Sequence, residues 1–324
     1  VISNIIYLWA LTVNSSAIEL VEENLEFHRM YFCLAKIAGV WKNEKDKNIF
    51  IFTNLLHSVI GNEAINYKQS LLLGLLKVMP IENQIAAVNV DIDMDAWDTK
   101  LAEQLVTEVL KTNMLSECII SYRSGRRWVQ EFQKSPQNLG VKNSSLKKGG
   151  TYLVTGGLGN LGFLISKHLI GEYRANVILL GRKKLSEFGK NKLYEKRYAE
   201  LKKLNDNVIY LDADVSVMDD IKECVLLNSG VFNAINGIIH LAGNVNNNDL
   251  EFIENSTFEK TFSMLAPKLK GVENLYEIFG GYKLDFIWLS SSLAATFGGI
   301  QLGAYATANS YLNHFTFSKS GILK

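Results

Sequence analysis

Residues 151–162 read TYLVTGGLGNLG, a short apolar strand that runs directly into a glycine-rich turn. Gly157, Gly159 and Gly162 fit the pattern GxGxxG. In a βαβ unit, the first glycine allows a tight turn, the second lets the backbone approach a pyrophosphate, and the third lets the next helix pack close to the strand. That helix then directs its free N–H groups at the phosphates. The same pattern also fits a loop that only needs small residues. The residues downstream must therefore distinguish a phosphate-binding turn from such a loop.

Composition limits the functions that this 324-residue chain can have. Its length predicts about two domains. With 34 Lys and Arg against 33 Asp and Glu, the charge gives no reason to expect nucleic acid or a membrane surface as a partner. No stretch holds the roughly 18 uninterrupted apolar residues of a membrane-spanning helix. Cys33, Cys118 and Cys224 are far apart and lack a CxxC pair. They therefore predict neither disulfides nor a zinc site, but reduced, buried thiols in a cytoplasmic protein.

The first half alternates predicted strands with predicted helices, which favours a parallel sheet. The expected strands are 5–13, 48–54 and 84–92, the expected helices are 19–38, 67–79 (ending before Pro80) and 96–112, and residues 118–132 form a hairpin that turns at Ser124 and Gly125. This half has no glycine-rich turn after its first strand and no cluster of catalytic side chains, so we interpret it as a scaffold.

Several charged or polar side chains of the first half have ordinary structural interpretations. We interpret His28 and His57 as structural histidines. Arg123, Arg126 and Arg127 are expected on a solvated face of the hairpin. The polar run 133–149 is the best candidate for a domain boundary.

The second half continues the βαβ pattern, with expected strands at 175–181, 208–211, 235–241 and 284–289 and expected helices at 163–173, 184–204 and 258–279. The second strand ends in Gly181-Arg182-Lys183, where NAD enzymes commonly carry an acidic residue that binds the ribose 2′-hydroxyl. A guanidinium suits a 2′-phosphate and predicts NADPH, with a solvated basic loop as the alternative. The charged helix 184–204 is interpreted as a solvated face.

Polar and small residues follow the later strands. Asp214 is placed either to bond an adenine amino group or to cap the helix that starts near Val217. Small residues at Ala242-Gly243 would let the backbone lie close to the nicotinamide ribose, whereas His240 is interpreted as core.

The last predicted strand ends in three serines, at 290–292. Tyr305 and Asn309 follow on an Ala-rich helix, four residues apart, and so share a face. A serine after a strand and a tyrosine on the next helix place two hydroxyls where such sheets bind their ligands.

In this order, TGGLGNLG, LLGR, DADV, HLAG, APKLKG, LSSS and YATAN resemble the ketoreductase domains of modular polyketide synthases, members of the extended short-chain dehydrogenase/reductase group. Simple members of the group carry Tyr-x-x-x-Lys on one helix. Here the fourth position after Tyr305 is Asn309, and the candidate lysine, Lys268, lies on the preceding long helix. That exchange marks the polyketide and fatty-acid synthase ketoreductases. Stretches at 8–11, 71–82, 88–93 and 121–129 resemble the structural subdomain that precedes the catalytic one, so the resemblance covers the whole chain.

The resemblance implies an α/β fold in two parts. Residues 1–140 would form a truncated, degenerate Rossmann-like structural subdomain that binds no cofactor. Residues 141–324 would form the catalytic subdomain, with a Rossmann-like, doubly wound parallel sheet, truncated at its C-terminus relative to the family.

The resemblance also implies a reaction: NADPH-dependent reduction of a β-ketoacyl thioester on the phosphopantetheine of an acyl carrier protein, beside other domains of the same synthase. Tyr305 would donate a proton to the carbonyl oxygen, Ser292 would orient that oxygen, Lys268 would assist by its charge, and Asn309 would hold the lysine or a relay water. The implied cofactor-binding residues are Thr155, Gly156, Gly157, Gly159, Asn160, Leu161, Gly162, Arg182, Asp214, Val215, Ala242 and Gly243. No metal is implied.

Two alternatives stay open: a ketoreductase-like domain that does not reduce, and, less favoured, a stand-alone dehydrogenase for a free alcohol. The turn departs from the TGxxxGxG of the simple enzymes at Asn160, a residue type that tolerates left-handed backbone. In the family, one stereochemical class carries Leu-Asp-Asp where this chain has Val245-Asn246-Asn247, and the other carries Trp where it has Phe297. Both markers are missing here, although Val245 keeps the hydrophobic first position of Leu-Asp-Asp. Hydroxyl configuration is therefore left open, with a lean toward the Leu-Asp-Asp class.

Overall fold

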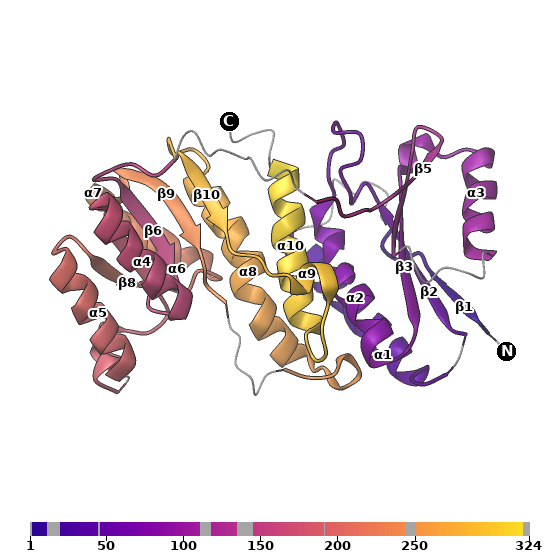
Figure 1. Ribbon diagram of the computed structural model, residues 1–324, viewed down its shortest axis with the longest axis horizontal. Helices are drawn as coiled ribbons and strands as arrows, with labels where there is room; N and C mark the ends of the chain where they lie inside the picture. Colours follow the sequence, from indigo (N-terminus) through magenta and orange to yellow (C-terminus); the bar gives the residue numbers. More distant parts are fainter. Residues whose placement is uncertain are drawn as a thin grey trace. The chain divides into compact units, whose positions relative to one another are not determined.

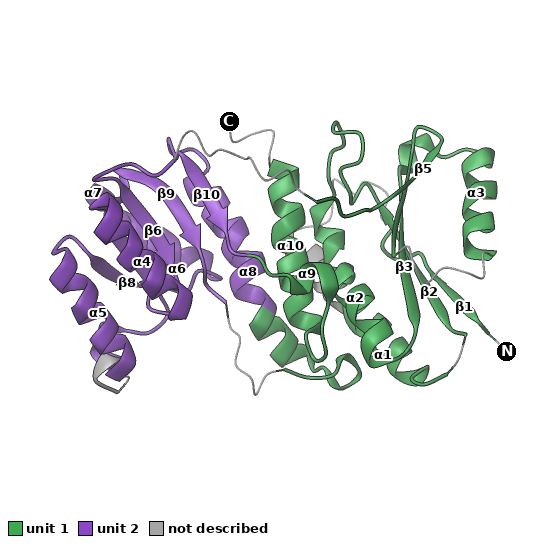
Figure 2. Ribbon diagram, in the orientation of Figure 1, with its two compact units in different colours: residues 1–135, 245–264, 291–324 green, residues 136–244, 265–290 purple. Residues whose placement is uncertain are grey.

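The computed structural model describes residues 2–11, 20–44, 46–110, 118–134, 145–190, 192–243 and 250–319 (Figure 1). The chain divides into two compact units (Figure 2). Unit 1 comprises residues 1–135, 245–264 and 291–324, and unit 2 comprises residues 136–244 and 265–290. The sequence predicts two continuous subdomains that meet near residue 140, whereas these units are discontinuous.

Unit 1 contains a five-stranded sheet in the order β1-β2-β3-β4-β5. Its strands are β1 (Asn4–Tyr7), β2 (Asn48–Asn54), β3 (Ala86–Ile92), β4 (Ile119–Arg123) and β5 (Arg126–Val129). β1 to β4 are parallel, and β4 and β5 form the predicted antiparallel hairpin. The hairpin turns through Ser124 and Gly125, whose φ angles of 50° and 70° are those of a tight two-residue turn.

The helices of unit 1 pack on this sheet and on one another. They are α1 (Leu20–Val40), η1 (Tyr67–Leu72), α2 (Leu73–Glu82), η2 (Met94–Ala96), α3 (Thr99–Leu110), η5 (Ile253–Asn255), the part of α8 (Phe258–Phe279) up to Met264, α9 (Ala294–Phe297) and α10 (Gly303–Lys319). The prediction that a helix ends before Pro80 is wrong, because α2 continues to Glu82. Glu82 anchors the helix end, since its carboxylate accepts hydrogen bonds from the N–H groups of Ile253 (2.8 Å) and Gln301 (2.6 Å).

Close helix packing explains why late segments of the chain belong to unit 1. A Cβ atom at Gly74 of α2 would lie 2.2 Å from the backbone nitrogen of Thr307, so only glycine lets α10 approach this closely. Residues 250–264 join the same unit through Glu254, whose carboxylate lies 2.6 Å from Lys42 Nζ. The boundary expected at 133–149 therefore separates the strands of the two sheets but not all of their helices.

Two expectations about exposure are wrong. Arg123 is 2% exposed and pairs with the buried carboxylate of Asp91, because β4 directs this side chain inward toward its neighbour β3. Of the other two arginines, Arg127 pairs with Glu108 (2.7 Å) and Arg126 is exposed. Of the three cysteines expected to be buried, Cys118 just before β4 is exposed, Cys33 is half-buried, and only Cys224 is buried.

Unit 2 contains a parallel five-stranded sheet in the order β10-β9-β6-β7-β8. Its strands are β6 (Thr151–Thr155), β7 (Asn176–Gly181), β8 (Ile209–Asp212), β9 (Ile235–His240) and β10 (Phe286–Leu289). The chain leaves the central strand β6 to form β7 on one side and later returns to form β9 on the other. This reversal is the topological switch point at which such sheets bind ligands, and the glycine-rich turn begins there.

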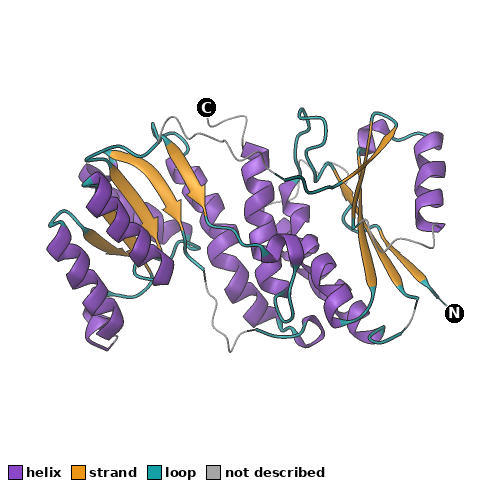
Figure 3. Cartoon of the chain, viewed as in Figure 1, coloured by secondary structure: helices purple, strands orange, loops and turns teal. Residues whose placement is uncertain are grey.

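Helices cover both faces of the second sheet (Figure 3). They are α4 (Asn160–Tyr173), η3 (Leu185–Lys190), α5 (Lys192–Leu204), α6 (Met218–Leu227), α7 (Ser229–Phe232) and the part of α8 (Phe258–Phe279) from Leu265 onward. Tyr152 and Val154 of β6 pack in a core with α4 and α5, whereas Leu153 packs with α6, α7 and α8. This alternation confirms the predicted Rossmann-like, doubly wound α/β fold.

Candidate active site

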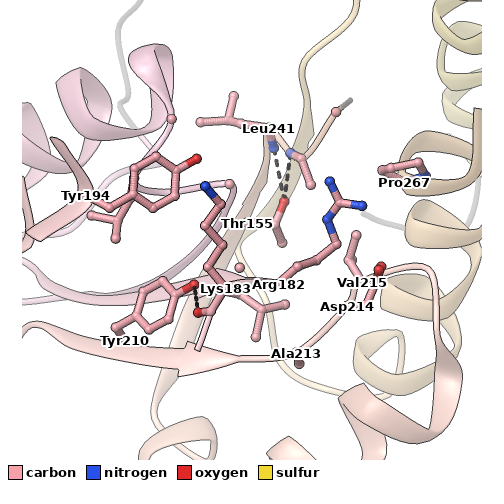
Figure 4. A pocket seen from close by; sticks show the side chains of 17 residues that line it. Thr155, Arg182, Lys183, Tyr194, Tyr210, Ala213, Asp214, Val215, Leu241 and Pro267 are labelled. Atoms are coloured by element: carbon pink, nitrogen blue, oxygen red, sulfur yellow. Dashed lines mark hydrogen bonds between the residues drawn. The ribbon is translucent and has the colours of Figure 1, made fainter. Parts of the chain in front are cut away.

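A cavity of about 390 Å³ lies at the carboxyl ends of the strands in unit 2 (Figure 4). Eight of the predicted cofactor-binding residues line it: Thr155, Gly156, Gly159, Arg182, Asp214, Val215, Ala242 and Gly243. The other four, Gly157, Asn160, Leu161 and Gly162, belong to the same turn and to the start of α4. The glycine turn, the basic residues after β7 and the small residues after β9 thus meet at one site.

Two positions of the glycine turn disfavour any residue other than glycine. Gly156 has a φ of +67°, and a Cβ atom there would lie 3.1 Å from the backbone nitrogen of Ala242. A Cβ atom at Gly162 would lie 2.3 Å from the carbonyl oxygen of Gly156. Gly162 therefore allows α4 to begin directly against the turn, which aims the helix N-terminus at the cavity side of the sheet.

Asn160 has a different role from the one expected. It is the first residue of α4 and has helical backbone, so the explanation that it tolerates a left-handed conformation is wrong. Its Oδ1 accepts a hydrogen bond from Arg197 Nη2 (2.7 Å), while Arg197 Nη1 donates to the carbonyl of Leu158 (2.7 Å). Arg197 thereby ties α5 to the glycine turn. The sequence gives no signal for this, because Arg197 is one of many charges on a helix interpreted as solvated.

Thr155 joins the end of β6 to the segment after β9. Its Oγ1 accepts from the N–H groups of Leu241 and Ala242, both at 3.1 Å. Its hydroxyl lies 2.8 Å from Nδ1 of His240 and donates to it, because the two amides occupy the acceptor sites of Oγ1. His240 is 1% exposed, and burial together with the charge of Lys268 lowers its pKa to about 3. His240 is therefore a neutral core residue, as expected.

Basic and aromatic side chains line the side of the cavity formed by β7 and β8. In the view of Figure 4, the guanidinium of Arg182 lies between Thr155 and Pro267, and Lys183 is directed toward Tyr194. Lys183 Nζ lies 4.7 Å from the centre of the Tyr194 ring, and Tyr210 donates from its hydroxyl to the carbonyl of Lys183 (2.7 Å). Sequence reasoning missed Tyr194 and Tyr210, since one lies on the charged helix and the other inside a strand.

Asp214 lines the cavity and does not cap α6. Its Oδ1 accepts from the backbone nitrogen (2.9 Å) and the hydroxyl (2.6 Å) of Ser216. The helix begins at Met218 after Val217, which has no side chain able to cap it. The helix-cap alternative is therefore wrong.

Lys268 is the predicted catalytic residue that lies in unit 2. It is 6% exposed, and its ammonium donates to the carbonyl of Ser290 at 2.7 Å. A Cβ atom at Gly243 would lie 3.5 Å from Lys268 Cε, so this lysine adjoins the wall of the cavity. Burial lowers the pKa of Lys268 to about 8, which leaves it mostly protonated at neutral pH.

The other three predicted catalytic residues lie in unit 1. Asn309 Nδ2 donates to the carbonyl of Tyr305 one turn earlier (2.7 Å), while its buried Oδ1 has no hydrogen-bond partner in the described ranges. Ser291 Oγ donates to the carbonyl of Asn309 (3.3 Å), and Ser292 Oγ accepts from the N–H of Ala294 (3.2 Å). The predicted residues are thus divided between the units: Lys268 and the residues around the cavity belong to unit 2, whereas Ser292, Tyr305 and Asn309 belong to unit 1.

Some expectations concern residues that the structure does not describe, and others concern metal sites and membrane spans. Val245-Asn246-Asn247 and the side chain of His28 lie outside them. Within the described ranges, no three or more potential metal ligands come together, and no helix is both long and apolar enough to cross a membrane.

Comparison with known proteins identifies the family. Residues 150–321 match the family model of the KR domain. The polyketide synthase PksM of Bacillus subtilis (strain 168) is 34% identical over 218 residues, which are 67% of this chain and 5% of PksM. The chain belongs to the ketoreductase (KR) domains of polyketide synthases.

Other synthases and solved ketoreductase structures are also similar to this KR domain. PksN of the same bacterium is 28% identical over 263 residues, which are 81% of this chain and 5% of PksN. A ketoreductase domain from the bacillaene assembly line superimposes with a TM-score of 0.79, at 24% identity, over 96% of this chain and 70% of that one. An N-terminal ketoreductase from the macrolactin assembly line gives 0.75, at 23% identity, over 98% and 62%. The KR domain therefore spans about one twentieth of these synthases and most of the length of the solved ketoreductase domains.

We expect Lys268→Met to remove a pH-dependent component of the stability of this KR domain. The folded pKa of about 8 lies below the value of 10.5 for an exposed lysine. Between these two pH values the folded lysine is largely neutral while the unfolded one still binds a proton, so the free energy of unfolding rises with pH. Across this window the wild type should gain about 3 kcal/mol relative to the variant. Urea unfolding of the wild type and the variant at a pH below and a pH above this range measures the difference in unfolding free energy. An equal pH dependence in both proteins would contradict a lowered pKa of Lys268.

Proposed function

We propose that this KR domain catalyses the NADPH-dependent reduction of a β-ketoacyl thioester, carried on the phosphopantetheine of an acyl carrier protein, to the β-hydroxyacyl thioester. Its family makes it a ketoreductase domain of polyketide biosynthesis. The observation that carries the finer proposal is the cavity at the switch point of the second sheet, where the glycine turn, Arg182 and the segment beside Lys268 meet. We propose that its partners are the carrier protein and other domains of a cytoplasmic synthase.

The residues around the cavity fit a dinucleotide phosphate. The residue before α4 is Gly159, which has no side chain to cap the helix, so the first N–H groups of α4 are suited to a pyrophosphate. The exposed guanidinium of Arg182 after β7 suits a 2′-phosphate. When bound, NADPH would supply the hydride from its nicotinamide ring.

In this proposal, the chain itself supplies the proton and the electrostatic stabilisation. Tyr305 donates the proton of its hydroxyl to the carbonyl oxygen of the substrate. Ser292 donates a hydrogen bond to the same oxygen and orients it. Lys268 contributes its buried ammonium. Asn309 would hold the lysine or a relay water, and its Oδ1 has no hydrogen-bond partner among the residues that the structure describes.

A turnover experiment tests the function directly. The KR domain is supplied with NADPH and the same β-ketoacyl group on N-acetylcysteamine or on an acyl carrier protein, nicotinamide absorbance is followed, and the configuration of the product is determined. We expect NADPH consumption to match β-hydroxyacyl formation, with the carrier-bound substrate preferred. NADPH binding without turnover of either substrate would indicate a non-reducing domain, and much faster turnover of free alcohols would indicate a stand-alone dehydrogenase.

We expect Arg182→Ala to weaken NADPH binding about 10- to 100-fold while hardly changing the affinity for NADH, because a charged hydrogen bond to a phosphate contributes about 1.5–3 kcal/mol. Lys184→Ala is the matched control, since Lys184 is exposed nearby but does not line the cavity. Fluorescence titration with both cofactors measures the effect. An equal loss for NADPH and NADH would contradict a 2′-phosphate contact.

A further inference from the structure

Unit 1 contains a second cavity, of about 400 Å³, that the proposed reduction does not use. His57, which follows β2, and His314, on α10, both line it. Nε2 of His314 lies 3.3 Å from Nδ1 of His57, with the ring centroids 5.2 Å apart. Two imidazoles from segments far apart in the sequence therefore meet through one nitrogen each.

The hydrogen bonds of the outer nitrogens fix which ring atoms carry hydrogen. His314 Nδ1 lies 2.8 Å from the carbonyl oxygen of Ser310. Because a carbonyl only accepts, His314 Nδ1 must carry the hydrogen. In the neutral ring, Nε2 of His314 then presents a lone pair to His57.

The same reasoning applies to His57. Its Nε2 lies 2.7 Å from Oδ1 of Asn89. Asn89 Nδ2 donates to the carbonyl of Ile51 (2.9 Å) and to Thr53 Oγ1 (3.0 Å), which sets the orientation of the amide. His57 Nε2 is therefore a donor, and Nδ1 of the neutral ring presents a lone pair to His314. If the hydrogen of His57 moved to Nδ1, Nε2 would face Asn89 Oδ1 with no hydrogen between them. If the Asn89 amide were also flipped, its oxygen would face the carbonyl oxygen of Ile51.

Since both outer nitrogens donate, neither of the facing nitrogens of the neutral rings carries a hydrogen, and two lone pairs face each other across 3.3 Å.

We propose that His57 and His314 bind a divalent transition-metal ion, with Zn²⁺ the best match, through Nδ1 and Nε2 respectively. With Zn–N bonds of about 2.0–2.1 Å, two nitrogens 3.3 Å apart subtend an angle of about 107° at the metal, close to the tetrahedral value. Imidazole also suits copper and nickel. The two remaining positions are left to water from the cavity.

The surroundings of the pair match those of metal-binding histidines. Such histidines donate their other ring N–H to a fixed acceptor, here the carbonyl of Ser310 and Oδ1 of Asn89. Asn89 is itself held by Thr53, whose hydroxyl donates to Asp91 at 2.7 Å. Ser310 lines the same cavity, and its buried Oγ has no hydrogen-bond partner among the residues that the structure describes, so this hydroxyl could bond a metal-bound water.

A bound metal would connect the segment after β2 to α10, the helix that carries Tyr305 and Asn309. His57 would then be a ligand rather than the structural histidine that the sequence suggests. Since the ion would bind the folded chain in preference to the unfolded one, saturating Zn²⁺ should raise the Tm.

Zn²⁺ titration of the 324-residue chain, followed by calorimetry, tests the proposal. We expect one Zn²⁺ per chain, at least tenfold weaker binding in His57→Gln and in His314→Gln, and unchanged binding in two controls. His168→Gln removes an exposed histidine, and Cys118→Ser removes the exposed thiol. No saturable binding in the wild type, undiminished binding in both histidine variants, or a loss only in a control would overturn the site.

A measurement on the unmodified, metal-free protein covers the case in which the variants fail to fold. Nitrogen-15 NMR of the histidine rings should show hydrogen on His57 Nε2 and His314 Nδ1, and none on the two facing nitrogens, at neutral pH. Zn²⁺ should shift the resonances of the facing nitrogens only in the wild type and the control variants. Hydrogen on either facing nitrogen would overturn the proposal.

Discussion

Tyr305→Phe is expected to lower kcat for β-ketothioester reduction by about 10²- to 10⁴-fold, the usual contribution of a positioned general acid, while NADPH binding stays unchanged. The substitution removes one hydroxyl and keeps the ring. Asn309 bonds the backbone carbonyl of Tyr305, not its side chain, so α10 should keep its structure. Steady-state kinetics with the N-acetylcysteamine substrate give kcat and KM, and fluorescence titration gives the NADPH affinity.

The matched control for this experiment is Tyr311→Phe, the same change on the same helix. Tyr311 is buried in unit 1 and has its ring 5.4 Å from that of Tyr67, so it has a packing role. This control should lose some thermal stability and keep its kcat near that of the wild type. Near-normal turnover in Tyr305→Phe, or an equal loss in both variants, would end the role proposed for Tyr305.

Gly162→Ala is expected to damage both stability and cofactor binding. The added methyl would lie 2.3 Å from the carbonyl oxygen of Gly156 and 2.7 Å from Cα of Gly157, and neither is a flexible side chain that could move aside. Forcing α4 away from the turn should cost about 1–3 kcal/mol of unfolding free energy. Because the turn and the N-terminus of α4 would shift together, NADPH affinity should fall as well.

Gly171→Ala is the control, since it adds the same methyl to the same helix where nothing lies within 4 Å. It should leave NADPH binding unchanged and leave stability equal or up to about 1 kcal/mol higher, because alanine favours helix over glycine. Urea unfolding and NADPH titration of both variants make the comparison. Wild-type behaviour of Gly162→Ala would show that the turn does not need the close approach.

Local sequence patterns predict the limits of a strand or helix well where the spacing of its apolar residues is clear. The strand at 48–54 and the helix at 258–279 have the predicted limits because each is a clear run of apolar spacing. The glycine turn likewise predicts the position of the cavity, because its glycines are needed locally for a tight turn and a close approach of the backbone.

Features that depend on partners distant in the sequence were not predictable. Arg123 is buried because Asp91 lies on the adjacent strand, and Arg197 matters because it reaches the turn 37 residues earlier. Likewise, α2 continues past Pro80 to Glu82, whose carboxylate bonds the N–H groups of Ile253 and Gln301 far along the chain. The roles of Ser292, Tyr305, Asn309 and Lys268 rest on the order of motifs along the chain and stay predictions.

The contact between Gly74 and Thr307 bears on how such domains can be exchanged between synthases. Most of α10 is buried, including Ala306, Ala308, Leu312 and Phe315, and it packs on α2 and η1 from the first third of the chain. A graft that transplanted residues 141–324 alone would strip α10 of that surface and expose its apolar side to water. An engineer who moves this ketoreductase into a foreign assembly line must therefore carry residues 1–135 of unit 1 as part of the same cassette.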